Sequence, residues 1–170
     1  MPRVIAGPVD AARKLVDCTT RVLESMFFAS VFDEIAEAGF VWEPMIGARV
    51  SFEGPVHGDL AVAATPQTAH TLACGFLAHD SPTEVEPGRI GETLAELANM
   101  ICGATLSSMD EEGLFTLAHP QAGPDAVACA VSGGGIRRLL DIGEGTLIVS
   151  LTFTARSDNA PSYAISGEAP

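Results

Sequence analysis

The sequence predicts an α+β fold in which two long helices cover one face of a single antiparallel sheet. Two segments, 10–29 and 89–109, place apolar residues at the spacing of one helix face. Each is followed by short stretches in which apolar and polar residues alternate, which is typical of half-buried antiparallel strands. Because both halves run in the same order, we expect a duplicated helix-and-strand motif, folded as one domain over residues 1–156.

The first half begins with the helix over 10–29, which has one apolar face and an opposite face of mixed charge. After a less regular segment, alternation over 48–53 and again over 59–64 predicts a hairpin, with glycines and a proline between the strands. Pro66 then marks the start of a short Ala-rich helix over 67–78.

The second half begins after a loop over 81–88, with the long helix over 89–109. Four later segments are predicted as strands: 114–119, 126–131, 136–142 and 146–155. The Gly-rich run 132–136 lacks the Gly-Lys-Ser/Thr ending of a phosphate-binding loop, so we expect a turn between strands there. Residues 157–170 have little to bury, and a flexible C-terminal tail is expected.

The composition argues against several classes of partner. Nine Lys and Arg against 22 Asp and Glu give a net charge of −13, which leaves no basic face for nucleic acid or for an anionic membrane. No apolar stretch is long enough to span a bilayer, and the N-terminus lacks the apolar core of a signal peptide. We therefore expect a cytoplasmic protein with reduced thiols.

The cysteines and histidines show no metal-binding spacing. Cys18, Cys74, Cys102 and Cys129 are far apart in the sequence, and the four histidines show neither H-x-x-x-H nor H-E-x-x-H. We expect the cysteines to be small buried apolar residues, and we expect no metal and no cofactor of the protein's own.

The helix over 89–109 has two contrasting sides. One side carries an apolar stripe of Ile90, Leu94, Leu97 and Ile101. The opposite side carries what we call the polar stripe: Glu92, Glu96, Asn99 and Gly103. Such a stripe is ordinarily just the solvated side of an amphipathic helix. Here, however, Asn is a mediocre helix former and Gly costs about 1 kcal/mol relative to Ala, which favours a surface that something else approaches.

Three stretches of the sequence resemble the CheC/CheX-type chemotaxis phosphatase family, and most closely its CheX branch. They are GETLAELANMICGATL in the second long helix, SFEGPVHGDLAVAA in the hairpin and RVLESMFF in the first helix. The family motif is Asp or Ser, three residues, Glu, two residues, Asn, and then Pro about two dozen residues later. Glu96 and Asn99 stand at the family's Glu and Asn positions. Glu92 stands where Asp or Ser is usual, while Pro120 and Pro124 fall two residues short of and two beyond the family spacing.

This resemblance implies a phosphatase that acts on the phosphoaspartate of a CheY-like response-regulator receiver domain. Asn99 would orient the attacking water through its side-chain amide, which can both donate and accept a hydrogen bond. Glu96 would pair with the receiver's phosphate-contacting lysine, and the Mg²⁺ at the phosphoryl group would belong to the receiver. Glu92 and Gly103 would contact the partner, with Glu92 either extending the contact or repelling the receiver's acidic pocket. The resemblance also implies a homodimer that pairs through its sheet.

Two other functions stay open at this stage. The chain could be a module that binds a receiver or a flagellar switch component without hydrolysing anything, which the altered Glu92 position favours. A long helix on an antiparallel sheet would also suit a hotdog-type thioesterase, with Glu96 or His57 as the base, although no acyl-binding signature accompanies it. The sequence names neither the receiver nor the pathway.

Overall fold

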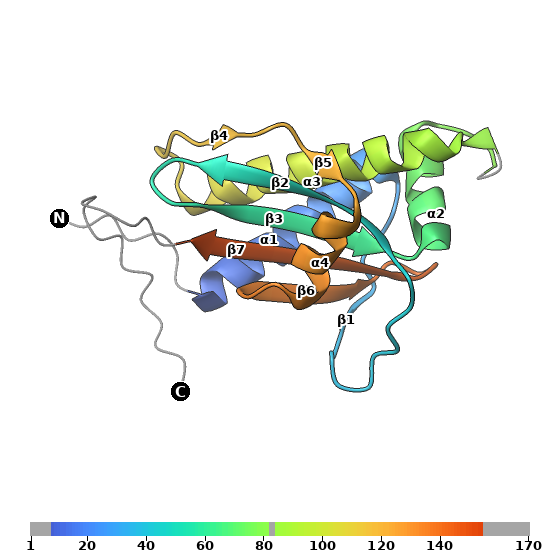
Figure 1. The fold of residues 1–170 in the computed structure, drawn as a ribbon, viewed down its shortest axis with the longest axis horizontal. Helices are drawn as coiled ribbons and strands as arrows, with labels where there is room; N and C mark the ends of the chain where they lie inside the picture. The colour runs from blue at the N-terminus through green and yellow to red at the C-terminus, as the bar shows by residue number, and fades with distance from the viewer. Residues whose placement is uncertain (1–7, 82–83, 155–170) are drawn as a thin grey trace.

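The fold was derived from a computed structural model that describes residues 8–81 and 84–154 (Figure 1). The helices are α1 (Pro8–Val22), the π-helical turn η1 (Leu23–Phe27), α2 (Pro66–Phe76), α3 (Pro87–Met109) and α4 (Pro124–Ser132). The strands are β1 (Asp33–Ile35), β2 (Ile46–Glu53), β3 (His57–Ala64), β4 (Thr116–Leu117), β5 (Gln121–Ala122), β6 (Ile136–Asp141) and β7 (Thr146–Thr154). The architecture is the predicted α+β fold with one antiparallel sheet.

In the sheet, the first strands of each half lie beside the hairpin of the other half. Its order is β1-β6-β7-β3-β2-β4, with β5 also paired to β2. The hairpins β2–β3 and β6–β7 meet at the centre, where Ala61 of β3 lies opposite Ser150 of β7. β1 from the first half forms the edge beside β6, and β4 and β5 from the second half lie beside β2. The duplicated order of elements is therefore visible as two interlocked halves.

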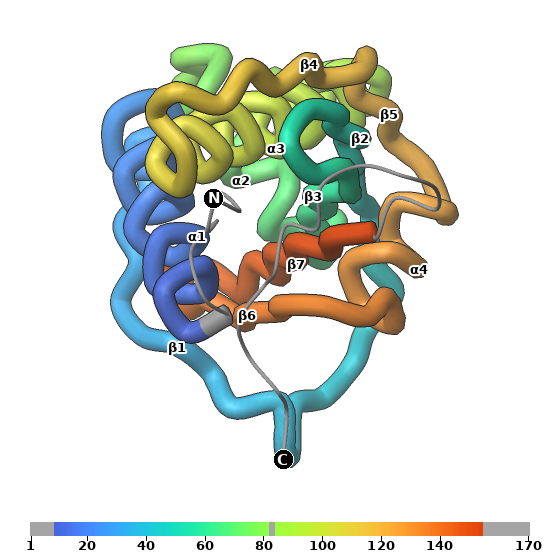
Figure 2. The backbone as a smooth tube through the Cα atoms, turned by 90° about the vertical axis from the view of Figure 1, so that its left-hand side faces the viewer, coloured from blue at the N-terminus to red at the C-terminus, as the bar shows by residue number. Residues whose placement is uncertain are grey.

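The two long helices α1 and α3 pack against each other and cover one face of this sheet, as predicted (Figure 2). Every second residue of the central strands points at them, including Val50, Leu60 and Leu151, each with no more than 1% of its surface exposed. The same core contains the apolar stripe of α3. Every second residue of the strands and one side of each long helix are thus buried in the same core, as the sequence pattern predicts.

The opposite face of the sheet is covered by α4, where the sequence predicted a strand over 126–131 (Figure 2). Pro124 is at the first position of this helix, and Ala126 and Ala130 form its buried side, one turn apart. The prediction was wrong because a short run of Ala, Val and Cys is apolar at either period, so the pattern does not separate strand from helix. Gly47 of β2 permits the contact, since a Cβ there would lie 2.6 Å from the Val62 carbonyl oxygen and 3.2 Å from Val127.

Other boundaries also differ from the prediction. The predicted strand over 114–119 shrinks to the two residues of β4. The Gly-rich run after residue 132 joins α4 to β6 and is not a turn between two strands. The first helix ends in the η1 turn at Phe28, whose φ of 54° is left-handed and closes the helix with an N–H···O bond to Leu23.

The four cysteines are free thiols, and two of them are buried as predicted. Burial, with a smaller contribution from the negative charge of Asp59, raises the pKa of the Cys102 thiol to about 12. Cys18 is also buried, whereas Cys74 and Cys129 are only half-buried, and Cys129 lies on α4 and not on a strand. The Cys102 side chain is therefore a neutral part of the α3 core.

The predicted tail over 157–170 lies outside the described residues, as does the end of the predicted domain at 156. None of the helices in the described ranges is both long enough and apolar enough to cross a membrane.

Candidate functional site

The helix α3 carries the predicted polar stripe on the side that faces away from the sheet. Its apolar stripe is fully packed, with Ile90 at 4% exposure and Leu94, Leu97 and Ile101 at 0%. The register of α3 on β2 and β3 is therefore set by these four side chains. Because the inner side is locked in the core, the direction of the outer side is fixed as well.

The polar stripe is most exposed to solvent near the start of the helix. Glu92 is exposed, while Glu96, Asn99 and Gly103 are half-buried beside neighbouring elements. Residues at these spacings lie within one narrow sector of an α-helix, and each is about one turn from the next. The structure thus brings all four predicted residues together on one side of α3.

Glu96 and Asn99 have no partner within the described part of the chain. The Glu96 carboxylate forms neither an ion pair nor a hydrogen bond there, and the Asn99 amide forms no hydrogen bond. By contrast, the half-buried Ser51 hydroxyl donates to Asp59 at 2.5 Å. A carboxylate and an amide one turn apart, held on a rigid helix and not used by the fold, are free to bind a group that arrives from outside.

Glu92 differs from these two because it has a partner within the chain. The Nη1 atom of Arg89 lies 3.4 Å from Oε2 of Glu92, in an i,i+3 pair whose side chains are 54% and 69% exposed. Sequence reasoning assigned no role to Arg89. The Arg and Glu spacing could have drawn attention to it, because residues three apart are neighbours on a helix surface.

Gly103 leaves an open position next to Asn99. A Cβ atom built at residue 103 would have no neighbour within 4 Å, other than the backbone of its own helix. Packing therefore does not require a glycine here, in contrast to Gly47 and Gly75, where a Cβ would lie within 2.6 Å of a backbone oxygen. The polar stripe ends in a shallow, uncrowded surface.

The C-terminal half of α3 is held by α1. The Nζ of Lys14 donates to the Ser108 carbonyl oxygen at 2.8 Å and also lies 3.4 Å from Oδ2 of Asp10. The last turn of α3 has no basic residue of its own, so Lys14 supplies the positive charge that favours a helix C-terminus. This contact holds the last turn of α3 against α1.

Comparison with known proteins was informative at the level of the fold and the family. A family model described as "Chemotaxis phosphatase CheX" matches residues 46–125, a range that contains the whole polar stripe. The predicted resemblance to the CheX family is confirmed. Comparison with curated protein sequences gives no match.

Solved CheX structures share this fold at low sequence identity. The chemotaxis protein CheX from Desulfovibrio desulfuricans is 20% identical, with a TM-score of 0.64 over 85% of this chain and 99% of that one. CheX from Vibrio vulnificus is 14% identical, with a TM-score of 0.66 over 88% and 99%. The CheX–CheY–BeF3–Mg²⁺ complex from Borrelia burgdorferi matches at 16% identity, with a TM-score of 0.65 over 86% and 99%. The CheX-like α+β fold of this chain is thereby established.

The CheX-like fold does not favour the hotdog thioesterase. Of the two bases considered for it, Glu96 lies on the outer side of α3, away from the sheet. His57 lies in β3 next to Gly58, on the face of the sheet that does not carry Leu60 and the helices α1 and α3. The two candidate bases therefore lie on opposite sides of the sheet.

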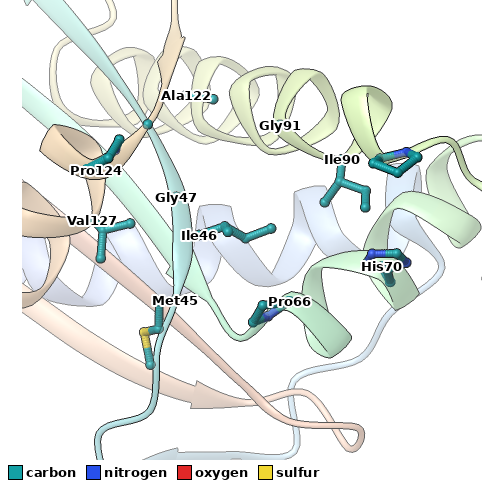
Figure 3. Close-up of a pocket in the computed structure, with 12 residues that line it drawn as sticks. Met45, Ile46, Gly47, Pro66, His70, Ile90, Gly91, Ala122, Pro124 and Val127 are labelled. Carbon is teal, nitrogen blue, oxygen red and sulfur yellow. The ribbon is translucent and has the colours of Figure 1, made fainter.

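A separate apolar groove of about 630 Å³ lies beside the first turn of α3 (Figure 3). Its lining comes from the start of β2 and from the first turns of α2, α3 and α4, with Ile46, Ile90 and Val127 among the apolar side chains. His70 is its one titratable lining residue, and neither Glu96 nor Asn99 lines it. The groove was not predicted from the sequence, because it depends on how three helix ends meet.

In the described parts of the chain, no group of three His, Cys, Asp or Glu residues is arranged to hold a metal ion. The polar stripe itself offers two carboxylates, Glu92 and Glu96, and one amide, Asn99.

Proposed function

We propose that this chain is a phosphatase that hydrolyses the phosphoaspartate of a CheY-like receiver domain. The observation that carries the proposal is the pair Glu96 and Asn99, at the positions of the CheX motif, rigidly held and without partners in the described chain. A phosphoaspartate is a mixed anhydride, so its hydrolysis needs positioning of water more than it needs a protein nucleophile.

In this proposal Asn99 orients the attacking water. Its carbonyl oxygen accepts a hydrogen bond from the water while its NH₂ group donates to a phosphoryl oxygen. The water oxygen then attacks phosphorus, the bond from phosphorus to the aspartate oxygen breaks, and the products are inorganic phosphate and a free carboxylate. Asn99 contributes to the transition state by geometry alone, which suits a side chain on a fixed helix.

Glu96 fixes how the two proteins dock. Its free carboxylate, one turn from Asn99, pairs with the receiver's phosphate-contacting lysine in a charge-assisted hydrogen bond. Gly103 extends the contact on the side of Asn99, and Glu92 lies at its rim on the side of Glu96. The Mg²⁺ that neutralises the phosphoryl group belongs to the receiver, and the phosphatase needs no cofactor of its own.

The CheX–CheY complex from Borrelia burgdorferi supports this choice of partner, because a protein with the same fold is there bound to CheY with BeF3 and Mg²⁺. The absence of a membrane-crossing helix from the described residues is compatible with the predicted cytoplasmic location, which stays a prediction.

The experiment is phosphate release from a phosphorylated receiver, with affinity for the beryllofluoride-loaded receiver titrated separately. We expect Asn99→Ala to lower turnover by about a hundredfold or more while affinity stays nearly the same. We expect Glu96→Ala to weaken binding by about 2–5 kcal/mol if the pair is desolvated, and by less if it stays wet. Both variants should melt like the wild type, since neither side chain lies in the core.

An Asn99→Ala variant that hydrolyses as fast as the wild type would contradict the catalytic role. If the wild type binds the loaded receiver but releases no phosphate, the alternative of a binding module takes its place. The altered residue at position 92 is the feature that favours this second candidate, because Glu carries a charge where Ser, one of the two usual residues, carries none.

A homodimer is also proposed, on the basis of the resemblance to the CheX branch. The edge strand β1 is only three residues long, and large exposed apolar side chains flank it, including Phe32 at 70% and Val41 at 77% exposure. Exposed apolar surface beside an open sheet edge is the kind of surface that a second copy covers.

A further inference from the structure

Arg89 is the one basic residue of α3, and it already has an ion-pair partner on the same helix. The sequence of α3, from Pro87 to Met109, contains no other Lys or Arg. Its guanidinium group lies 3.4 Å from the Glu92 carboxylate, on the exposed flank of the polar stripe. The pair lies about 10 Å from Asn99 along the helix axis, measured from Glu92, which follows from the rise of an α-helix.

This distance excludes a role at the reacting atoms. A water molecule oriented by Asn99 and a group two turns away cannot be in contact. Arg89 and Glu92 therefore lie at the rim of the docking surface. Charges at a rim change affinity and its dependence on salt more than they change chemistry.

Without Arg89, the polar stripe would carry two uncompensated carboxylates one turn apart, Glu92 and Glu96. Like charges at i,i+4 repel each other, and the whole chain already has a net charge of −13. The charge of Glu96 serves docking by pairing with the receiver's lysine. The charge of Glu92 lies at the rim of the docking surface, near a receiver pocket whose own carboxylates bind a divalent cation. An unpaired Glu92 would repel that pocket.

We propose that Arg89 is a positioning residue that neutralises Glu92 on the docking surface, so that Glu96 is the single uncompensated charge of the polar stripe. The inference rests on the proposed function and extends it to the choice of partner. Arg89 acts through Glu92 and makes no contact with the reacting atoms.

The proposal predicts that the effect of removing Arg89 depends on Glu92. We expect Arg89→Ala to raise the Kd for a CheY-like receiver loaded with beryllofluoride and Mg²⁺ by about threefold in about 0.05 M NaCl. The increase should vanish in about 0.5 M NaCl, where exposed charges are screened. In a Glu92→Ala background, the same substitution should change Kd much less. Arg89→Lys should keep the wild-type affinity.

The matched control is Arg13 of α1, which is 71% exposed and pairs with Asp10 at 2.6 Å across the same i,i+3 spacing. Arg13→Ala lies outside the polar stripe and should not change Kd at either salt concentration. The rate of phosphate release at saturating phosphatase should be unchanged in Arg89→Ala, which separates docking from chemistry.

Three outcomes overturn the inference. One is an Arg89→Ala variant with the wild-type Kd at low salt. Another is an equal loss of affinity with and without Glu92, which would mean that Arg89 binds the receiver directly. The third is an equal effect of Arg13→Ala, which would mean that only the overall charge matters. A wild-type protein that binds but does not hydrolyse contradicts the proposed function alone, since the Kd series still tests Arg89.

Discussion

Asn99 and Gly103 are poor helix formers in the middle of a 23-residue helix. Neither is required by the fold, because the Asn99 amide has no hydrogen-bond partner in the described chain and Gly103 has open space around its Cα. Residues that lower the stability of their own helix, and that make no compensating contact in the fold, are expected at sites that bind a partner. The energetics of α3 therefore support the proposed docking surface.

We expect Gly103→Ala to stabilise the protein by about 1 kcal/mol. The added methyl group meets nothing within 4 Å, so the substitution reduces the backbone entropy of the unfolded chain at no cost in packing. Urea denaturation measures the change in the free energy of unfolding. An unchanged or lower stability would show that the open space is filled by something else.

The larger side chain of Gly103→Leu should also be tolerated by the fold, but it should obstruct the receiver. Affinity for the beryllofluoride-loaded receiver would then fall while the melting temperature does not. Ala128→Leu, which places the same leucine side chain at an exposed position of α4 on the far side of the sheet, is the control and should bind like the wild type.

The sequence was sufficient to place Glu96, Asn99 and Gly103 on one side of α3, because helical period alone determines that. It was not sufficient for Arg89. Both Glu86 and Glu92 are three residues from Arg89, so spacing allows either partner. Arg89 pairs with Glu92 because of where α3 begins: Glu86 is the N-cap residue, and its extended backbone lies outside the helix.

At the scale of elements, α4 shows where pattern reasoning reaches its limit. Long amphipathic helices such as α3 are predicted well because polar residues interrupt the apolar ones at a fixed period. The segment 126–131 contains Ala, Val and Cys alone. What makes it a helix is tertiary: the small Ala130 packs with Ala61 and Ala63 of β3, which lets the helix backbone approach the sheet closely.

We expect Ala130→Leu to destabilise the protein by about 1–3 kcal/mol. Ala130 is fully buried between α4 and the sheet, so extra methyl groups force α4 away from β3. The exposed Ala128 on the same helix again provides the control, since Ala128→Leu should leave the midpoint of urea denaturation nearly unchanged. Equal midpoints for the two variants would contradict the described packing of α4.

The edge elements β4 and β5 were predicted poorly for a related reason. Leu114, at the start of the predicted strand over 114–119, is 89% exposed, and only Thr116 and Leu117 pair with β2. Pairing resumes at Gln121, after Pro120, which has no N–H group to donate. An edge strand pairs with one neighbouring strand only. The number of residues that pair therefore depends on that neighbour more than on the alternation of apolar and polar residues in the edge strand itself.

At the scale of the whole molecule, the order of helices and strands indicated a duplication, but the exchange of first strands could not be predicted. β1 has three residues, two of them the acidic Asp33 and Glu34, and no alternation of its own. Its place beside β6 is set by side chains distant in sequence: Arg138 of β6 lies 3.3 Å from Glu34, and Arg137 of β6 is paired with Glu37 just after β1. Pairings across 100 residues leave no local signal.

The homodimer is the last prediction, and the two edges of the sheet allow a direct test of it. Of the seven large exposed apolar side chains in the described chain, five lie between residues 26 and 42, around β1. We therefore expect a dimer that covers the β1 edge, and expect Phe32→Glu to separate it into monomers, because a buried unpaired charge opposes association.

Sedimentation of the wild type and two variants at micromolar concentration provides the measurement. Leu114→Glu is the matched control, since Leu114 is exposed to 89% beside β4 at the other edge of the sheet. A wild-type monomer would contradict the homodimer while leaving the docking mechanism intact. A dimer that Leu114→Glu dissociates and Phe32→Glu does not would place the interface at the β4 edge, next to α3, where a second copy would compete with the receiver for the polar stripe.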